Sequence, residues 1–402
     1  MAHAPKKPGL FVRELIASKT FAVIVAISLS GWLCLSQMKC EVRSEGSSSH
    51  LQQTMQRIEL TPDGRGFRFA ESGDRFIPWG FNYDHDETGR LIEDYWESEW
   101  DKVVADFREM KQLGANVVRI HLQVGRFLPV PDRPCPQALG TLRRLLELAA
   151  RTGLYLDLTG LGCYHRRDTP AWYDALSEAQ RWAIQVRFWE AVAQTCAGHP
   201  AVWCYDLMNE PVIPGSRRLS GEWLGPEFGG KCFVQFLTLD PAGRAREEIG
   251  EQWLRTLVSA IRRYDTRTLV TVGLLDGNID RRKFHSGFNL KVLAHYLDFL
   301  SLHIYPKSGE IQAAVQRLEE YALGKPLVIE ETFPLHCSAA ELERFMLGSR
   351  KYACGWLGFY WGKSLEECRQ STSLADRITL SWLELFQKLR PNDSRPIPKR
   401  ER

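Results

Sequence analysis

Runs of mostly apolar residues, each ending in a polar side chain, recur along this chain. Segments whose apolar residues have helical spacing separate them. The clearest run extends from Ala201 to Met208 and leads directly into Asn209, Glu210 and Pro211. A run of this kind is typical of a strand that is buried on both faces, and a proline cannot continue its hydrogen-bonded ladder. The pattern therefore predicts a buried strand whose C-terminal end carries the Glu210 carboxylate.

Strand-like and helix-like segments alternate from residue 76 to residue 389. The predicted strands are 76–82, 116–122, 154–158, 201–208, 268–272, 299–303, 326–330 and 356–361. The predicted helices are 98–113, 139–152, 178–197, 247–264, 290–296, 311–323, 342–347 and 374–389. Eight strand–helix units favour a (β/α)8 TIM barrel, a closed form of the α/β class, over an open doubly wound sheet. The first strand is not followed by a glycine-rich phosphate loop, which also argues against a dinucleotide-binding fold.

Shorter patterns predict what lies at the two ends of this barrel. Strand-like segments at 56–60 and 67–69 flank Pro62-Asp63-Gly64, so we expect a small N-terminal β-hairpin that caps the barrel's floor. Two long connections, 212–246 and 273–289, follow the predicted fourth and fifth strands. A connection of such length is usually functional or disordered. The aromatic residues in the first one favour an ordered wall or lid over a cleft.

The N-terminal region differs from the rest of the chain. Basic residues precede an apolar segment at 21–35, which is short for a membrane span and suits the core of a signal peptide. The basic part is long for a signal peptide, so we expect residues 1–40 to be either a signal peptide or an N-terminal membrane anchor. The barrel would then be exported, as a secreted or periplasmic protein, or tethered through residues 21–35 outside the cytoplasm. A linker at 41–55, a catalytic domain at 56–390 and a polar tail at 391–402 complete the predicted organisation.

Composition narrows the functional classes. The 402 residues include 52 basic and 49 acidic ones, which gives a net charge of +3, so nothing indicates a nucleic-acid partner. The ten cysteines form no CxxC pair and the histidines show no metal-ligand spacing, so we expect no metal and no redox motif. If the protein is exported, loop cysteines such as Cys135, Cys163, Cys232 and Cys337 could pair, in an order that the sequence does not give. We expect a monomer.

Polar side chains collect at the predicted strand ends. They are Arg119 and His121 on the second strand, Asn209 and Glu210 on the fourth, His303 and Tyr305 on the sixth, Glu330 and Glu331 on the seventh, and Trp361 on the eighth. The C-terminal ends of barrel strands converge, so residues far apart in the sequence become neighbours. Two carboxyl groups across a barrel mouth suit cleavage of a glycosidic bond, because one donates a proton to the leaving oxygen while the other attacks the anomeric carbon or activates water. An arginine beside only one of them would keep the two in different protonation states.

These motifs resemble glycoside hydrolase family 5, the cellulase and mannanase family within the retaining glycosidases of clan A. The resemblance rests on Asn209-Glu210-Pro211, Arg119, His303-Ile304-Tyr305, Lys325-Pro326-Leu327-Val328-Ile329-Glu330-Glu331 and Trp361, with Gly80-Phe81-Asn82-Tyr83 and Leu113-Gly114-Ala115-Asn116-Val117-Val118-Arg119 in the first two units. Asn-Glu-Pro alone is moderately specific, whereas these motifs in the right order at barrel spacing are highly specific. The likeness extends over residues 57–389.

The resemblance implies a hydrolase that cleaves O-glycosidic bonds of a β-linked polysaccharide or oligosaccharide, of the β-glucan or β-mannan type, without a cofactor. In the double displacement of this family, Glu210 would be the acid/base and Glu331 the nucleophile. Asn209 would hold the sugar 2-hydroxyl. Tyr305 would donate to the nucleophile, and Arg119 would keep it ionised.

Four further residues complete the candidate substrate-binding set. The resemblance implies that His303 lines the site near the acid/base and that Trp361 is the stacking floor for the sugar. His121 belongs either to the site or to the packing around it. The loop aromatic Trp172 either faces the substrate or is part of the core.

Three alternatives stay open at this stage. The family usually has a histidine where this chain has Thr159, and His165 is a candidate substitute a few residues on. Glu330 is a rival to Glu331 as nucleophile, and alternation along a strand predicts that the two side chains point in opposite directions. The same barrel could also be a carbohydrate-binding protein that has lost turnover.

Overall fold

The computed structural model describes residues 55–276 and 286–391. The predicted signal peptide or anchor, most of the predicted linker and nearly all of the predicted tail lie outside the described residues, as does part of the connection at 273–289. Among the residues that are described, no helix combines the length and apolar character that a membrane span requires.

Eight parallel strands form a closed barrel, as the sequence predicts. In order around the barrel they are β4 (Trp79–Tyr83), β5 (Val117–Gln123), β6 (Tyr155–Gly162), β7 (Val202–Asn209), β10 (Leu269–Leu275), β11 (Leu300–His303), β12 (Leu327–Thr332) and β13 (Gly355–Gly358). The ring closes where β13 pairs with β4. Nearly all of the strand residues are buried, because side chains fill the barrel on one face and helices cover the other.

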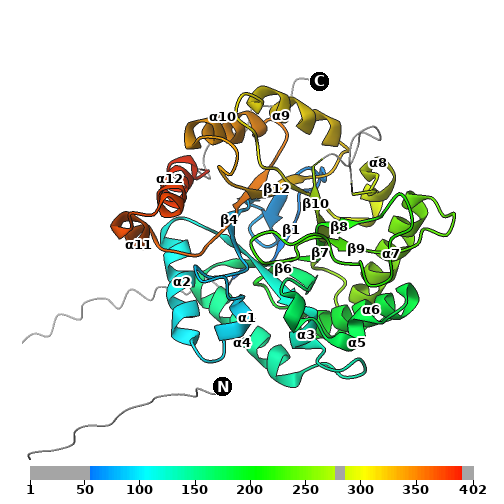
Figure 1. Cartoon of the computed structure of the whole chain (residues 1–402). Coiled ribbons are helices and arrows are strands. Elements are labelled where there is room, and N and C mark those ends of the chain that lie inside the picture. Colours follow the sequence, from blue (N-terminus) through cyan, green and yellow to red (C-terminus); the bar gives the residue numbers. More distant parts are fainter. Residues whose placement is uncertain (1–54, 277–285, 392–402) are drawn as a thin grey trace, which may run out of the picture. The chain divides into compact units, whose positions relative to one another are not determined.

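Helices surround the barrel in a ring (Figure 1). The α-helices are α1 (Ile92–Tyr95), α2 (Trp100–Gln112), α3 (Val124–Phe127), α4 (Pro136–Thr152), α5 (Ala171–Asp174), α6 (Glu178–Cys196), α7 (Arg246–Arg262), α8 (Leu290–Leu293), α9 (Ile311–Arg317), α10 (Ala339–Ser349), α11 (Leu365–Gln370) and α12 (Leu374–Leu389). Local signals fix several of their ends. Ser177 caps α6 by accepting from the Gln180 backbone, and Gly153 ends α4 with a left-handed φ of 70°.

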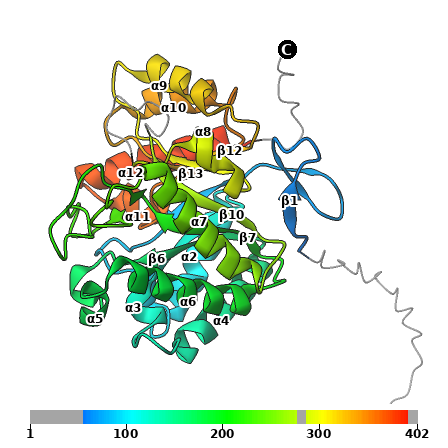
Figure 2. The same ribbon diagram turned by 90° about the vertical axis from the view of Figure 1, so that its right-hand side faces the viewer.

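A small antiparallel sheet closes the N-terminal end of the barrel. The predicted hairpin is confirmed as β1 (Ile58–Leu60) and β2 (Phe67–Phe69), and a third strand, β3 (Arg75–Phe76), pairs with β2. Phe76, which we predicted to begin the first barrel strand, therefore belongs to this sheet. Phe67 packs edge-on against Trp203 and Phe299. Figure 2 shows β1 at the end of the barrel away from the loops that follow β7.

The long connection after β7 is ordered and forms an antiparallel arm, which we define as residues 223–236. Leu224 pairs with Gln235 and Phe228 pairs with Lys231, so the chain reverses at Gly229 and Gly230. Both glycines have positive φ angles, which such a tight two-residue turn requires. At the base of the arm, β9 (Gln235–Phe236) pairs with β8 (Pro211–Val212), directly after Glu210.

The tryptophans and cysteines mostly serve packing. Eight tryptophans are fully buried: Trp79, Trp96, Trp189, Trp203, Trp223, Trp253, Trp361 and Trp382. Most of the 13 tryptophans of the chain therefore belong to the core. The cysteines within the described residues, including Cys135, Cys163, Cys232 and Cys337, form no disulfide.

Candidate active site

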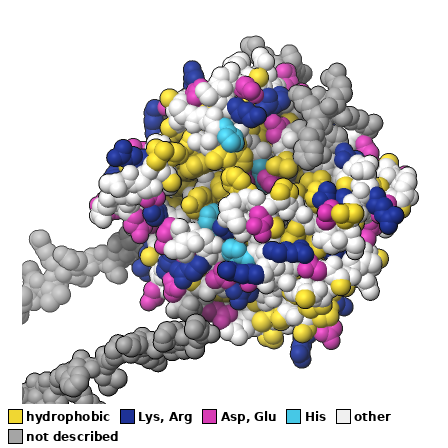
Figure 3. Space-filling view, viewed as in Figure 1, with side chains coloured by type: hydrophobic (Ala, Val, Ile, Leu, Met, Phe, Trp, Pro, Cys, Tyr) yellow, Lys and Arg dark blue, Asp and Glu magenta, His cyan; other side chains and the backbone are white. Residues whose placement is uncertain are grey.

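The C-terminal ends of the barrel strands face the viewer in Figures 1 and 3. Hydrophobic side chains gather near the middle of this face, with histidine and acidic side chains among them (Figure 3). Glu210 follows the last residue of β7 and its backbone N–H donates to the Gly273 carbonyl at 2.9 Å. Its φ of 47° lies in the left-handed region, which non-glycine residues seldom adopt and which is common at functional sites.

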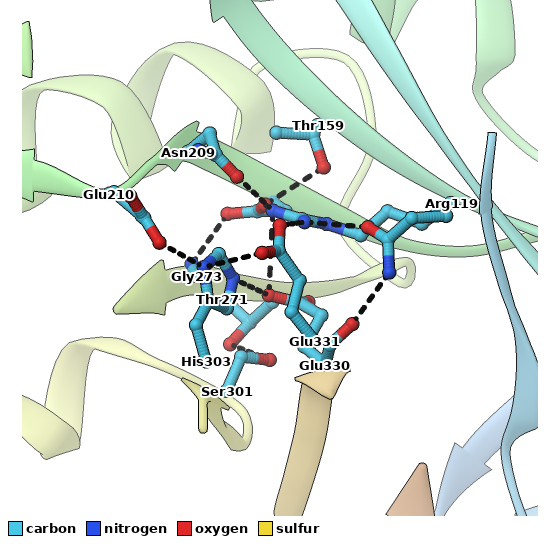
Figure 4. A network of polar contacts seen from close by, with 12 residues as sticks. Arg119, Thr159, Asn209, Glu210, Thr271, Gly273, Ser301, His303, Glu330 and Glu331 are labelled. Carbon is cyan, nitrogen blue, oxygen red and sulfur yellow. Dashed lines mark hydrogen bonds and ion pairs between the residues drawn. The ribbon is translucent and has the colours of Figure 1, made fainter. Parts of the chain in front are cut away.

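Arg119 joins four strands at the centre of the barrel (Figure 4). Its Nη1 donates to Glu331 Oε1 at 2.6 Å and to Asn82 Oδ1 at 2.9 Å. Its Nη2 donates to Asp206 Oδ2 at 2.6 Å and to Asn209 Oδ1 at 3.0 Å. A fully buried guanidinium with two direct carboxylate partners is strongly held in position, because moving it would leave buried charges unpaired.

Glu331 receives a hydrogen bond on each carboxylate oxygen. Arg119 donates to Oε1, and the Tyr305 hydroxyl donates to Oε2 at 2.6 Å. Burial raises the pKa of Glu331 and the nearby charge of Glu210 adds to this effect, while His303, Arg119 and Tyr305 act in the opposite direction. The two donors therefore favour the ionised form and fix the orientation of the carboxylate.

His303 lies between the two candidate catalytic carboxyl groups. Its Nδ1 is 2.8 Å from Glu210 Oε1 and 3.4 Å from Glu331 Oε2. Although burial alone would lower the pKa of His303, the surrounding Glu331, Glu210 and Glu330 raise it to about 10. An oxygen of Glu210 and an oxygen of Glu331 lie within 4.8 Å of each other. The imidazolium thus holds two carboxyl groups close together that would otherwise repel each other.

Glu330 and Glu331 both face the network, which corrects the prediction that they point in opposite directions. Glu330 Oε2 is 3.6 Å from Arg119 Nη2 and 3.3 Å from His303 Nε2. The physical reason is an irregularity in β12: its pairing with β11 shifts register just before Glu331, which disturbs the simple alternation of side chains.

Glu330 belongs to a second, deeper group of acids with Asp157 and Asp206. Oxygens of the three carboxyl groups lie within 4.8 Å of one another, and all three residues are fully buried. Burial raises the pKa of Asp157, and with Glu330 it raises the pKa of Asp206 to about 6. Burial opposes ionisation of Glu330 too, yet Arg119 and His303 bring its pKa down to about 2. The positive charges of Arg119 and His303 therefore offset part of the negative charge of this group.

A model of the cellulase family, glycosyl hydrolase family 5, matches residues 80–361 of the chain. This range contains all eight barrel strands except the first residue of β4, and every residue of the network described above. The chain belongs to glycoside hydrolase family 5. It is therefore a glycoside hydrolase, as the sequence motifs predict. A search among curated protein sequences gives no significant match.

Solved structures share the fold of this family 5 enzyme at low sequence identity. An exo-β-1,4-mannosidase from Opitutaceae bacterium strain TAV5 is 18% identical over 82% of this chain and 61% of that chain, with a TM-score of 0.61. This chain thus spans less than two thirds of that protein. A family 5, subfamily 18 variant from Streptomyces cattleya, in complex with Manβ1-4GlcNAc, is 16% identical over 81% and 83%, with a TM-score of 0.59. A β-1,4-mannanase from the sea hare Aplysia kurodai is 16% identical over 85% and 99%, with a TM-score of 0.57.

Asn209 and His121, two of the predicted polar residues, form hydrogen bonds with members of the polar network of the family 5 enzyme. The Asn209 side chain accepts from Arg119 and donates from Nδ2 to the Phe233 carbonyl at 3.0 Å. His121 is buried and contacts the Tyr164 hydroxyl through Nδ1 and Asn82 Oδ1 through Nε2. Burial, with the nearby charge of Arg119, lowers the pKa of His121, so we infer that its ring is neutral.

Thr159 and His165, the two residues considered for the place of the usual family histidine, lie in different surroundings. The Thr159 hydroxyl donates to Asp206 Oδ2 at 2.8 Å, so it belongs to the deeper acid group. His165 lies just before a short 3₁₀ helix, η1 (Arg166–Asp168), and its buried Nε2 has no hydrogen-bond partner among the described residues. Trp172 packs edge-on against Tyr173, and its indole N–H donates to the Pro129 carbonyl. Both contacts are with residues outside the barrel strands.

Trp361 is not a sugar platform. Only 1% of its surface is exposed, and its ring packs edge-on against Phe81 in the core. We predicted the last strand to run to residue 361, but β13 ends at Gly358. The first residue beyond the strand is therefore Phe359, which is half-buried and has its ring centroid 6.3 Å from that of Tyr305.

The sequence analysis also missed a set of residues across the barrel from Glu210. Asp84 and His85 follow β4, Tyr360 follows Phe359, and Lys231 comes from the arm. His85 stacks on Tyr360 with ring centroids 4.1 Å apart. The run Asn82-Tyr83-Asp84-His85-Asp86 after the first barrel strand is a polar signal at a strand end that could have identified two of them. Lys231 gives no such signal, because only the folded arm brings it there.

Proposed function

We propose that this enzyme hydrolyses β-linked glycans by double displacement with retention of anomeric configuration, with Glu331 as nucleophile and Glu210 as acid/base. The observation that carries the proposal is the short gap between the two carboxyl groups, which have oxygens within 4.8 Å of each other. Retaining glycosidases hold their carboxyl groups about 5–5.5 Å apart, whereas inverting ones leave about 6.5–9.5 Å for a water molecule.

In the first step, an oxygen of ionised Glu331 forms a bond to the anomeric carbon as the bond from that carbon to the leaving oxygen breaks. Glu210 gives its proton to the leaving oxygen. Arg119 and Tyr305 hold the attacking carboxylate in place through hydrogen bonds of 2.6 Å each. His303 occupies one oxygen of Glu210, which leaves the other oxygen for the leaving group.

In the second step, Glu210 takes a proton from a water molecule whose oxygen attacks the anomeric carbon. The bond between that carbon and Glu331 breaks, and the carboxylate returns to its two hydrogen-bond donors. Two inversions at one carbon give net retention. The Asn209 amide keeps a second N–H beyond the one that it gives to Phe233, and we assign that N–H to the sugar 2-hydroxyl.

For the substrate, we propose a β-1,4-linked mannose glycan first and a β-glucan second. The support comes from the structural neighbours, which include an exo-β-1,4-mannosidase, a β-1,4-mannanase and a variant in complex with Manβ1-4GlcNAc. These similarities establish the fold, so a panel of both glycan types is the direct test.

The roles of the two glutamates are tested by Glu331→Ala and Glu210→Ala, with Glu320→Gln on the exposed surface as control. We expect each Ala variant to lose turnover on the panel by at least about 1,000-fold, since the two residues act in the same steps. With an activated aryl β-glycoside and azide, Glu331→Ala should give the α-glycosyl azide, because azide occupies the nucleophile's space. Glu210→Ala should give the β-glycosyl azide, because azide attacks the glycosyl-enzyme.

Near-normal hydrolysis by either Ala variant would reject the assignment. If the unmodified enzyme binds glycans from the panel but hydrolyses none, the barrel is a carbohydrate-binding protein instead.

A further inference from the structure

The arm at residues 223–236 closes one side of the C-terminal face. It leaves β7 next to Glu210, and on its way the Cys232 backbone donates to the Tyr164 carbonyl at 2.8 Å and Gln235 Nε2 donates to the Leu161 carbonyl at 2.6 Å. Its tip reaches the loop after β4, where a Cβ placed on Gly89 would lie 3.5 Å from Lys231 Nζ. The arm therefore passes over the end of β6 and reaches the loop after β4.

Lys231 places an ammonium group at this end of the arm. The residue is only 4% exposed, yet no hydrogen bond or ion pair joins its Nζ to any residue in the described part of the chain. Asp84 and Asp86 act on it electrostatically without a direct ion pair. The three N–H donors of this ammonium have no acceptor among the described residues, so they are free to bind a group that accepts hydrogen bonds.

Asp84 has a carboxylate oxygen that lacks a hydrogen-bond donor among the described residues. Its side chain is fully buried, and Oδ1 contacts His85 Nδ1 at 2.8 Å. Its Oδ2 is buried and has no hydrogen-bond donor among the residues that the structure describes. The carboxylate of Asp84 acts electrostatically on Tyr305, Tyr164 and His121, all of which surround the catalytic network. Within the described ranges, a buried carboxylate oxygen without a donor and an ammonium without a direct protein partner thus lie on the same side of the site.

Aromatic rings complete this side. His85 stacks on Tyr360. The ring centroid of Phe359 is 6.3 Å from that of Tyr305 and 6.2 Å from that of Phe233. Sugar hydroxyl groups both donate and accept hydrogen bonds, while the C–H faces of a sugar ring pack on aromatic rings. Asp84, Lys231 and these rings are therefore matched to a sugar.

The position of this group decides which sugar it meets. In the order of strands around the barrel, β13 lies directly across from β7 and β4 lies next to β13. Glu210, which protonates the leaving group, lies at the end of β7. The group around Asp84 is thus on the side away from the leaving group, where the non-reducing part of the substrate has to lie.

We propose that Asp84 and Lys231 bind the hydroxyl groups of a non-reducing terminal sugar, so that the enzyme releases one sugar at a time from chain ends. Asp84 Oδ2 accepts from one hydroxyl, and Lys231 Nζ donates to a neighbouring one. In this proposal the arm, which reaches Gly89 in the loop after β4, blocks a longer chain on that side. This inference rests on the proposed hydrolysis of β-linked glycans and adds the site of attack along the chain.

The first test uses the full chain and β-1,4-linked hexaoses of mannose and of glucose, each tagged at the reducing end. Attack at chain ends should give the free monosaccharide and the tagged pentaose as the first products, followed by the tagged tetraose. Early release of tagged mono-, di- or trisaccharides would show internal cleavage and overturn the inference, while hydrolysis itself would still be established. Failure to hydrolyse any glycan would instead count against the proposed function.

The second test compares Lys231→Met and Asp84→Asn with the exposed controls Lys291→Met and Asp101→Asn. We expect kcat/KM to fall about 10- to 100-fold in the first two, since each loses a hydrogen bond between a charged group and a hydroxyl. The controls should match the unmodified enzyme.

Tagged disaccharides that lack the 3-, 4- or 6-hydroxyl of the terminal sugar separate binding from a structural role. The unmodified enzyme should discriminate against at least one of them, and the discrimination should shrink about tenfold in the variant that has lost the partner of that hydroxyl. An equal penalty in the unmodified enzyme and both variants for all three substrates would overturn the assignment.

Discussion

Among single residues, His303 is notable because it contacts three carboxyl groups of the site. Its two ring nitrogens face Glu210, Glu331 and Glu330, and Arg119 supplies the other buried positive charge. The imidazolium lowers the repulsion between carboxyl groups that catalysis needs to hold close together. Its charge should therefore contribute to folding stability as well as to the geometry of the site.

This contribution gives a pH dependence with a definite sign. The pKa of His303 is raised from 6.5 to about 10, so the folded protein binds this proton more tightly than the unfolded chain. The stabilisation is complete below about pH 6.5 and disappears as the pH rises through about 10. The difference in unfolding free energy between the unmodified enzyme and His303→Asn should therefore be largest near pH 6 and shrink towards pH 10. Urea denaturation at a series of pH values measures it, with His295→Asn on the surface as control. A constant difference across this range would contradict the prediction.

Phe359 and Trp361 lie close together in the sequence, but we expect Phe359 to act in the site and Trp361 to act in the core. Phe359 lies beside Tyr305 with part of its ring exposed, whereas Trp361 packs against Phe81. We expect Phe359→Ala to lower kcat/KM about tenfold or more with little change in stability, because a sugar loses its aromatic contact. Trp361→Phe should lower the unfolding free energy by about 1–3 kcal/mol and leave KM unchanged.

Steady-state kinetics and denaturation on both variants measure the two effects. If Trp361→Phe changes KM while stability is unaffected, then Trp361 rather than Phe359 contacts the sugar.

At the scale of elements, the sheet at the floor of the barrel is separated from the chemistry by the length of the strands. Phe67 is fully buried and meets Trp203 and Phe299 at the end opposite to the catalytic network. The packing at this end therefore contributes to stability, as is general for the N-terminal face of such barrels.

Phe67→Ala should lower the unfolding free energy by about 3–5 kcal/mol, because it leaves a cavity beside the rings of Trp203 and Phe299. The kcat and KM of the folded enzyme should not change. Chemical denaturation and steady-state kinetics check both statements, and Leu347→Ala on the exposed face of α10 serves as control. A loss of activity without a loss of stability would mean that the floor sheet acts on the site.

The elements also show what the sequence could predict and what it could not. Apolar runs located the eight strands because burial on both faces leaves a continuous hydrophobic pattern. The strand ends were harder, since pairing with neighbours sets them: Gly358 pairs with Phe81 and ends β13 three residues before Trp361. The irregularity in β12 likewise has no hydrophobic signature, and it turns both Glu330 and Glu331 towards Arg119.

The candidate site likewise contains residues that the sequence predicts and residues that it does not. The polar residues at strand ends, Arg119, Asn209, Glu210, His303 and Glu331, come together because closure of the barrel brings those ends together. Lys231 could not be predicted, because its place depends on the pairing within the arm and on contacts to β6 and to the loop after β4.

At the scale of the whole molecule, every described strand pairing and both hydrophobic clusters lie between Met55 and Leu389. The strand pairings within this range close the barrel. We propose that residues 21–35 direct the barrel out of the cytoplasm, either as a cleaved signal or as a tether. Folding and catalysis would then be properties of the barrel, and location a property of the N-terminal region.

A variant that begins at Thr54 separates these two properties. It should unfold within about 2 °C of the full chain and keep its kcat/KM, since it retains all contacts of the barrel and its floor sheet. In bacterial cells, the full chain should appear in the periplasm or the medium with a shortened N-terminus, or in the membrane fraction with an intact one, while the variant should stay in the cytoplasm. Mass spectrometry of the mature N-terminus together with cell fractionation distinguishes these results. A full chain with an intact N-terminus in the cytoplasm would contradict a role in export, because the apolar segment would then have neither been cleaved nor held the protein at a membrane.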